Sequence, residues 1–265
     1  MSQIVPLVIE PDLDDPGCAD VMVDGRIEGR AYRFVLDTGA GRTHVVADDF
    51  LSALAGGGTV SSSGVFAPHR NATVRVSDLV VGPVRAPDVA VALVEAAQPG
   101  ARNLLGMDVL KDFNCHFRFD RATLVIDDAV DPDGMRPLLM DEASHPFVEV
   151  TWPGVTASSV WDSGAGITIV DHVFWSQYRG LFEELGSSVG TDAAGAQVET
   201  QTYTVVGPRI GGQQFASHKI AVVDLSGPNS TLTRPMDMIL GYTTLRQANW
   251  LFDFPRREWR ITSRV

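Results

Sequence analysis

A short motif that occurs twice constrains the fold of this chain more than any other sequence feature. Asp37-Thr-Gly-Ala follows the apolar run FVL, and Asp162-Ser-Gly-Ala follows the run SVW, 125 residues further along. An ionised carboxylate beside an apolar strand is costly to bury unless another group pairs with it. We therefore expect the two sites to lie together, so that each forms part of the environment of the other.

The similarity between the two halves extends well beyond this motif. The sequence VVGP at 80–83 returns at 205–208 with the same offset of 125, and NLLGMDVL around Gly106 matches MILGYTTL around Gly241 at an offset of 135. The matching positions after these glycines are Asn114, Phe117, Phe119 and Arg121 in the first half and Asn249, Phe252, Phe254 and Arg256 in the second. A repeat of this size predicts an internal duplication, with one lobe per copy.

The local patterns within each half predict mostly strands. Short alternating or β-rich runs such as RAYRFVLD and ASSVWD are typical of strands, and short helices are predicted at 48–54 and 172–185. The acidic stretch DDAVDPDGMRP predicts a linker, and its acidic residues lack the spacing of a calcium-binding loop. The predicted division is an N-terminal lobe at 1–127, an inter-lobe linker at 128–144 and a C-terminal lobe at 145–265.

Composition and charge narrow the range of partners. With 45% hydrophobic and 20% charged residues the chain is typical of globular proteins, and its net charge of −12 argues against nucleic acid and anionic membranes as partners. No apolar run approaches the ~20 residues of a spanning helix, and the N-terminal residues show no signal peptide. Two cysteines are too few for a disulfide framework, and the histidines show no metal-ligand spacing. We therefore expect a cytoplasmic protein that needs no metal and no cofactor.

Taken together, these motifs resemble those of the aspartic protease superfamily. FVLDTGAG, NLLGMDVL and NCHFRFDRATLVI resemble the bacterial retropepsin-like branch, and MILGYTTLRQANWLFDFPRREWRIT resembles the end of a pepsin C-terminal lobe. The resemblance covers residues 20–127 and 145–262. It implies an all-β, bilobal fold of two duplicated retropepsin-like β-barrel lobes with short helices. It also implies a bacterial-type protein that is active as a monomer, because both lobes belong to one chain.

The resemblance implies an aspartic endopeptidase, in which Asp37 and Asp162 activate a water molecule between them. The chemistry of amide hydrolysis agrees, because one group must act as a base while another acts as an acid. Two carboxyl groups held close together cannot both ionise cheaply, so they share one proton. In this superfamily the residues that follow the aspartates have supporting roles, which here fall to Thr38, Gly39, Ser163 and Gly164.

The resemblance assigns a role to each of these supporting residues. The hydroxyl groups of Thr38 and Ser163 would reach across to the backbone of the opposite lobe. Gly39 and Gly164 would allow a tight turn that brings a backbone N–H near a carboxylate. Gly106 and Gly241 would let a strand cross close to that turn.

The walls and the cover of the cleft follow from the same resemblance. Flap hairpins are expected at 61–73 and 186–198, with Phe66 as an apolar cover on the first. The predicted substrate-binding residues are Arg42, His44, Phe66, Ile167 and Ile169. Their different characters in the two lobes predict a cleft with one cationic and one apolar half. An alternative for Arg42 is a solvated side chain, or one that pairs with Asp48 or Asp49.

Two other functions are compatible with these motifs. The chain could be a peptide-binding module with a protease-like fold, or a dyad enzyme of peptide maturation. In each case the expected partner is a peptide or a protein. The presence of both aspartates favours the endopeptidase, because a binding module has no need of the pair.

Overall fold

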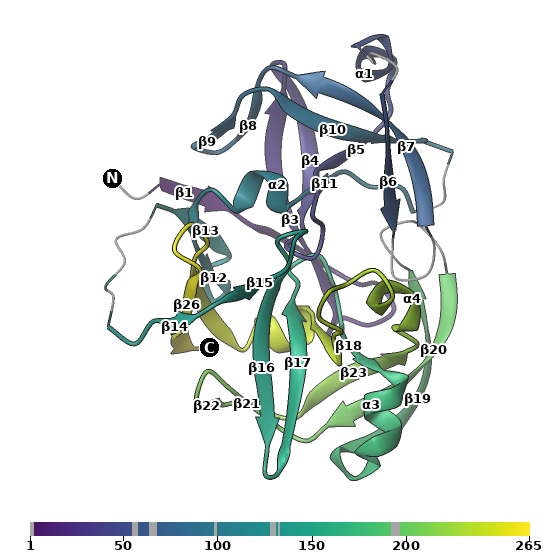
Figure 1. The fold of residues 1–265 in the computed structure, drawn as a ribbon, viewed down its shortest axis with the longest axis vertical. Helices are drawn as coiled ribbons and strands as arrows, with labels where there is room; N and C mark the ends of the chain where they lie inside the picture. The colour runs from purple at the N-terminus through teal and green to yellow at the C-terminus, as the bar shows by residue number, and fades with distance from the viewer. Residues whose placement is uncertain are drawn as a thin grey trace.

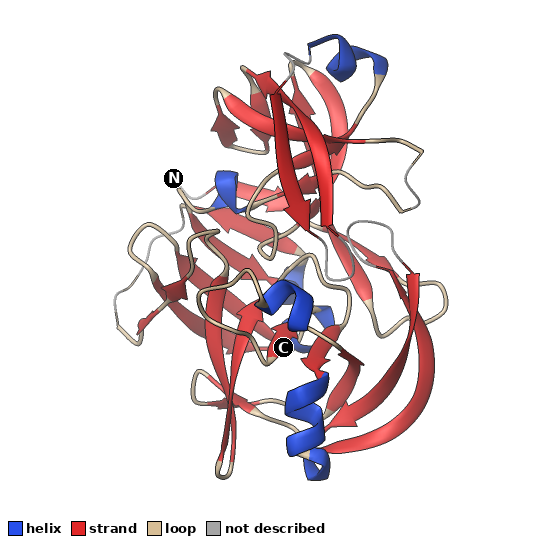
Figure 2. Ribbon diagram, turned by 45° about the vertical axis from the view of Figure 1, so that its right-hand side comes forward, coloured by secondary structure: helices blue, strands red, loops and turns tan. Residues whose placement is uncertain are grey.

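The computed structural model describes residues 3–54, 58–63, 68–97, 100–127, 131, 133–191 and 197–265. Figure 1 shows two lobes, one above the other, with most of the chain in strands. The helices of the described residues are short, and the longest are α1 (Asp49–Leu54) and α3 (His172–Gln177). The predicted all-β, bilobal fold is confirmed (Figure 2).

Ten strands of the described chain form the sheet of the first lobe. Their order is β6-β7-β10-β5-β11-β4-β3-β8-β9, with β2 paired to β3. The strands are β2 (Val8–Pro11), β3 (Ala19–Ile27), β4 (Arg30–Leu36), β5 (His44–Val46), β6 (Gly58–Ser63), β7 (Pro68–Val76), β8 (Leu79–Val81), β9 (Val84–Ala86), β10 (Val89–Val94) and β11 (Leu104–Leu105).

Ten described strands of the second lobe form a sheet with the same topology. Their order is β19-β20-β23-β18-β24-β17-β16-β21-β22, with β15 paired to β16, so each strand has a counterpart in the first lobe. The strands are β15 (Leu139–Met140), β16 (Pro146–Trp152), β17 (Val155–Trp161), β18 (Thr168–Asp171), β19 (Phe182–Thr191), β20 (Gln197–Val205), β21 (Arg209–Ile210), β22 (Gln213–Gln214), β23 (His218–Val223) and β24 (Met238–Leu240).

A third sheet contains strands from both halves of the sequence. Its order is β1-β13-β12-β25-β26-β14, and β12 pairs with β25 so that Cys115 lies opposite Phe252. The strands are β1 (Gln3–Pro6), β12 (Asn114–Arg118), β13 (Thr123–Ile126), β14 (Arg136–Pro137), β25 (Ala248–Asp253) and β26 (Glu258–Arg264). We call this the inter-lobe sheet. It joins the lobes through continuous backbone pairing.

Aromatic side chains of the inter-lobe sheet pack against the strand that leads to Asp162. The ring of Trp161, at the end of β17, lies 4.7 Å from Phe117 and 4.7 Å from Phe252, measured between centroids. Trp161 and Phe252 are fully buried. Aromatic rings at these separations add to the stabilisation that burial provides, so the backbone before Asp162 is held firmly.

The remaining helices include α2 (Met107–Leu110), α4 (Ser226–Asn229) and α5 (Tyr242–Leu245), with 3-10 turns at Phe119–Arg121 and Arg179–Leu181. The helix predicted at 172–185 ends at Gln177, and that part of the prediction is wrong. Phe182 begins β19 instead, because Phe182–Thr191 pairs with β20. No helix among the described residues is long and apolar enough to cross a membrane.

Candidate active site

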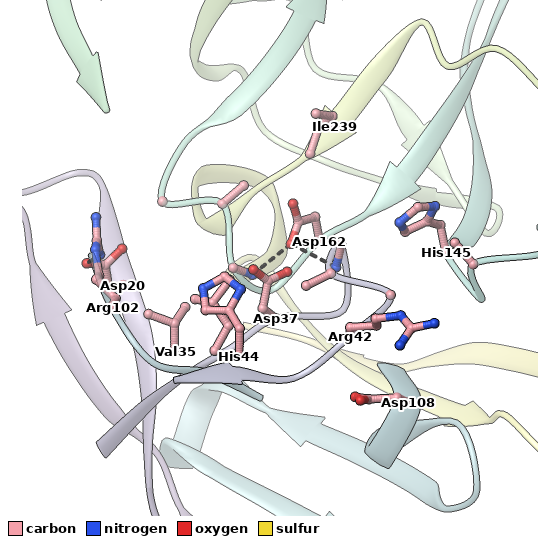
Figure 3. A pocket seen from close by; sticks show the side chains of 18 of the residues that line it. Asp20, Val35, Asp37, Arg42, His44, Arg102, Asp108, His145, Asp162 and Ile239 are labelled. Carbon is pink, nitrogen blue, oxygen red and sulfur yellow. Dashed lines mark hydrogen bonds and ion pairs between the residues drawn. The ribbon is translucent and has the colours of Figure 1, made fainter. Parts of the chain in front are cut away.

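Asp37 and Asp162 occupy equivalent places at the ends of β4 and β17. The backbone N–H of Asp37 donates to the carbonyl of Leu105 (3.0 Å), and that of Asp162 donates to the carbonyl of Leu240 (3.0 Å). Both carboxyl groups line one cleft, side by side, and the charge of Asp162 acts on the Asp37 carboxyl group (Figure 3). The structure therefore brings the two predicted aspartates together between the lobes.

Hydroxyl groups next to the aspartates tie the two lobes together. Thr38 Oγ1 donates to the carbonyl of Trp161 (2.8 Å), and Ser163 Oγ donates to the carbonyl of Leu36 (2.6 Å). Each hydroxyl oxygen also accepts a bond from the backbone N–H of the other residue, at 3.1 and 3.2 Å. Thr38 and Ser163 are almost completely buried, so four polar backbone groups depend on these two side chains.

Gly39 and Gly164 lie against the carboxyl groups of the opposite lobe. A Cβ atom on Gly39 would overlap the carboxyl group of Asp162, and one on Gly164 would overlap that of Asp37. Neither glycine has a positive φ, so the reason for glycine here is space and not backbone conformation.

The two carboxyl groups have different hydrogen-bond partners. Asp162 Oδ1 accepts bonds from the backbone N–H groups of Gly39 (3.2 Å) and Gly164 (2.8 Å). Asp37 Oδ1 is buried and has no hydrogen-bond partner among the described residues. Donors favour the ionised form of a carboxyl group, so this arrangement favours the anion at Asp162.

The pKa values of the pair follow the same asymmetry. Burial, and then the negative charge of Asp162, raise the pKa of Asp37 well above its usual range. Burial also raises the pKa of Asp162, but the Gly164 N–H, the Asp37 side chain and the Gly39 N–H oppose that rise. With one proton between them, the preferred state has Asp37 protonated and Asp162 ionised.

The later glycines of the repeat support the loops that carry the aspartates. A Cβ on Gly106 would overlap the backbone of Ala40 and Arg42, and one on Gly241 would overlap the backbone of Ala165 and Ile167. Backbone bonds of 2.8 Å join the residue after each glycine to these loops, from Met107 to Ala40 and from Tyr242 to Ala165. The close crossing expected at both glycines is present.

The cleft around the pair has a volume of about 1550 Å³ and is lined by both lobes. Arg42, His44, Ile167 and Ile169 all line it, and their role in substrate binding stays a prediction. Arg42 is exposed and forms no ion pair with Asp48 or Asp49. Burial raises the pKa of the half-buried Asp108, and the charge of Arg42 is among the causes that oppose this rise. Burial lowers the pKa of His44 to about 4, so this ring is neutral.

The expected flaps coincide with two hairpins. β6 pairs with β7 as far as Ser63 opposite Pro68, and β19 pairs with β20 as far as Thr191 opposite Gln197. Thr200 and Thr202 of the second hairpin line the cleft. Residues 64–67 and 192–196, and with them the predicted cover Phe66, lie outside the described residues.

Comparisons with known proteins agree with this geometry. Residues 23–112 match the model of a family described as "gag-polyprotein putative aspartyl protease". The crystal structure of an aspartic proteinase from Irpex lacteus is similar over 100% of this chain and 98% of that chain, with a TM-score of 0.60. Residues 23–112 are thus similar to an aspartyl protease family, and the whole chain has the fold of an aspartic proteinase. Sequence identity to the Irpex lacteus enzyme is only 13%, and no curated protein sequence matches the chain.

Sequence reasoning missed two side-chain pairs at the cleft. Arg102 forms an ion pair with Asp20 of the first lobe. His145 lines the cleft (Figure 3), and its Nδ1 is hydrogen-bonded to Asp141 Oδ2 (2.7 Å). Neither pair belongs to the repeated motif, and only the folded chain brings these residues to the aspartates. The one available signal was the acid four residues before His145, which is common on any surface.

Proposed function

We propose that this chain is an aspartic endopeptidase that hydrolyses peptide bonds with Asp37 and Asp162. The observation that carries the proposal is the meeting of two buried or half-buried carboxyl groups, one from each lobe, at the floor of a single cleft. Their environments drive their pKa values apart, which is what a site needs to provide an acid and a base at the same pH.

In the proposed reaction, Asp162 is the base and Asp37 is the acid. The Asp162 carboxylate accepts a proton from a water molecule while the water oxygen attacks the peptide carbonyl carbon. The proton of Asp37 moves toward the carbonyl oxygen and stabilises the charge that develops there. The resulting tetrahedral intermediate collapses when the amide nitrogen accepts a proton, which the newly protonated Asp162 carries.

The shape of the cleft supports an extended peptide as the substrate. Its volume exceeds that of sites for small molecules, which are about 300–1,000 Å³. Both lobes contribute walls, and the hairpin of β19 and β20 borders the cleft. Because one chain supplies both aspartates, we propose a monomer as the active form. The shared strand order of the lobes supports an origin by duplication.

A mixed peptide library, read by mass spectrometry, tests the proposal. We expect wild-type protein to cut the library, and Asp37→Asn and Asp162→Asn each to lower the rate by at least ~10³-fold. The double variant should be no slower than either single variant, because the pair acts as a unit. Asp24→Asn, at an exposed ion pair with Arg33, is the matched control and should retain the rate.

Three results would contradict the proposal. A single variant with a near-normal rate would exclude the paired mechanism. Retention of peptides on wild-type protein without cuts would favour the peptide-binding module. Turnover of a modified peptide at a bond other than an amide would favour a dyad enzyme of peptide maturation.

A further inference from the structure

His145 is held beside the cleft by a double contact with Asp141. Asp141 Oδ2 accepts a bond from Nδ1 of His145 (2.7 Å), and Asp141 Oδ1 accepts a bond from its backbone N–H (2.8 Å). The Asp141 side chain is only 4% exposed and that of His145 is 18% exposed. The carboxylate fixes the proton on Nδ1 and sets the orientation of the ring.

The segment that carries His145 is packed against the loop that carries Asp37. A Cβ on Gly41 would overlap the carbonyl oxygen of Ala143, so the two backbones are in direct contact. Ser144 has a positive φ of 69° and donates its N–H to the carbonyl of Asp141 (3.0 Å). This tight turn leaves the ring of His145 at the cleft, on the side of Asp162 (Figure 3).

The equivalent position in the first lobe carries a different group. Pro146 begins β16 and pairs with the end of β15, as Ala19 begins β3 and pairs with the end of β2. The residues before them, His145 and Cys18, are therefore counterparts. Burial raises the pKa of the Cys18 thiol to about 12, so the first lobe presents a neutral group where the second presents an imidazole.

We propose that Asp141 and His145 form a positioning pair that keeps the negative charge of the aspartate pair on Asp162. The proposal rests on the proposed function, in which Asp37 is the acid and Asp162 is the base. It concerns how His145 makes the two aspartates unequal. Burial raises the Asp162 pKa, and attraction between a protonated His145 ring and an anion at Asp162 is among the causes that oppose this rise. Asp141 holds Nδ1 of His145, and His145 itself lines the cleft that contains the aspartate pair.

Several charged groups near His145 also affect how the negative charge is shared between Asp37 and Asp162. Asp141 and Glu142 lie on its own segment, Asp37 and Arg42 lie on the loop after β4, and Asp108 lies on α2. Arg42 is exposed, and solvent screens its effect on the pair. His145, by contrast, is held in place by its contact with Asp141.

The test compares His145→Gln, His145→Lys and wild type by two measurements. The first is the pH profile of kcat/KM on a peptide substrate, and the second is the titration of the aspartate carboxyl carbons by NMR. In His145→Gln we expect the acid limb of the profile and the first carboxyl titration to move up by about 0.5–1 pH unit. KM should change less than twofold, because the ring acts through Asp162.

His145→Lys restores a positive charge without the ring, and we expect it to recover at least half of the shift. His172→Gln, at an exposed histidine of the same lobe outside the cleft, is the control and should leave both measurements unchanged. An unmoved carboxyl titration in His145→Gln, or a lysine variant that behaves like glutamine, would overturn the proposal.

The NMR titration does not depend on turnover. Absence of cleavage by wild type would therefore refute the proposed function, whereas a shifted titration in the same sample would still support the electrostatic role of His145.

Discussion

In the first lobe, Asp37 Oδ1 has no hydrogen-bond partner among the described residues, whereas in the second lobe Asp162 Oδ1 accepts bonds from two backbone N–H groups. The strands that lead to these residues have the same order and the same neighbours. A shared topology therefore places two carboxyl groups symmetrically without making them chemically equal. The inequality comes from a few local donors and from the groups that surround each loop.

The hydrogen bonds that support the loops after Asp37 and Asp162 also differ between the lobes. In the first lobe, Thr43 donates from its backbone N–H and from its hydroxyl to Asp108 Oδ1, at 2.8 and 2.7 Å. In the second lobe, the backbone N–H of Thr168 donates to the hydroxyl of Thr243 (3.0 Å). Burial raises the pKa of Asp108, although the bonds from Thr43 oppose that rise. The first lobe thus carries a titratable support where the second carries a neutral one.

The largest effect should come from adding a methyl group at the glycines that face the carboxyl groups. Gly39→Ala displaces the carboxyl group of Asp162, and Gly164→Ala displaces that of Asp37. We expect each to lower kcat by about 10²-fold or more, because small misplacements of reacting groups are costly. Gly180→Ala, with no atom within 4 Å of the added Cβ, is the control. Normal kcat in either variant would show that the pair tolerates displacement in that lobe.

A more symmetric effect, on stability and not on kcat, is expected at the hydroxyl groups that join the lobes. Thr38→Val leaves the carbonyl of Trp161 and the N–H of Ser163 unpaired, and Ser163→Ala leaves the carbonyl of Leu36 and the N–H of Thr38 unpaired. Each should lower the free energy of unfolding by about 2–4 kcal/mol in urea titrations. Ser52→Ala on the exposed side of α1 is the control. Costs that differ by more than about 2 kcal/mol between the lobes would show that the two contacts are not equivalent.

The smallest effect is expected from Arg42→Ala. Arg42 is exposed and Asp108 lies near it, so solvent and that acid weaken its attraction for an acidic substrate residue. Subsite profiling should show a preference for Asp or Glu at one position beside the cut that falls by about fivefold or less in the variant. Arg256→Ala, on the exposed surface away from the cleft, is the control. Identical profiles would mean that the selectivity of the cleft does not depend on Arg42.

The sequence repeat predicts many of the residues that form the site. The spacing of the two motifs predicts that Asp37 and Asp162 meet, and the structure brings them together. It could not predict which of them holds the proton, because that depends on N–H groups contributed by loops of both lobes. The sequence did not point to His145 either, because this residue lies outside the repeated motifs.

Two features of the fold also depend on pairing between distant segments. The pattern at 172–185 suits a helix locally, but Phe182–Thr191 finds a partner in β20 and forms a strand. Sheet formation with distant residues overrides local preference in such cases. The inter-lobe sheet was likewise not predicted, because nothing in the amino-acid sequence of β12 indicates that it pairs with β25.

The inter-lobe sheet can form fully only late in synthesis of the chain. β12 at Asn114–Arg118 pairs with β25 at Ala248–Asp253, which leaves the ribosome much later. Until then β12 has an unpaired edge, and such edges favour aggregation. The backbone before Asp162 also lacks Phe252, one of the aromatic rings that hold it. A nascent chain therefore contains both aspartates before it contains the strand that holds them in place.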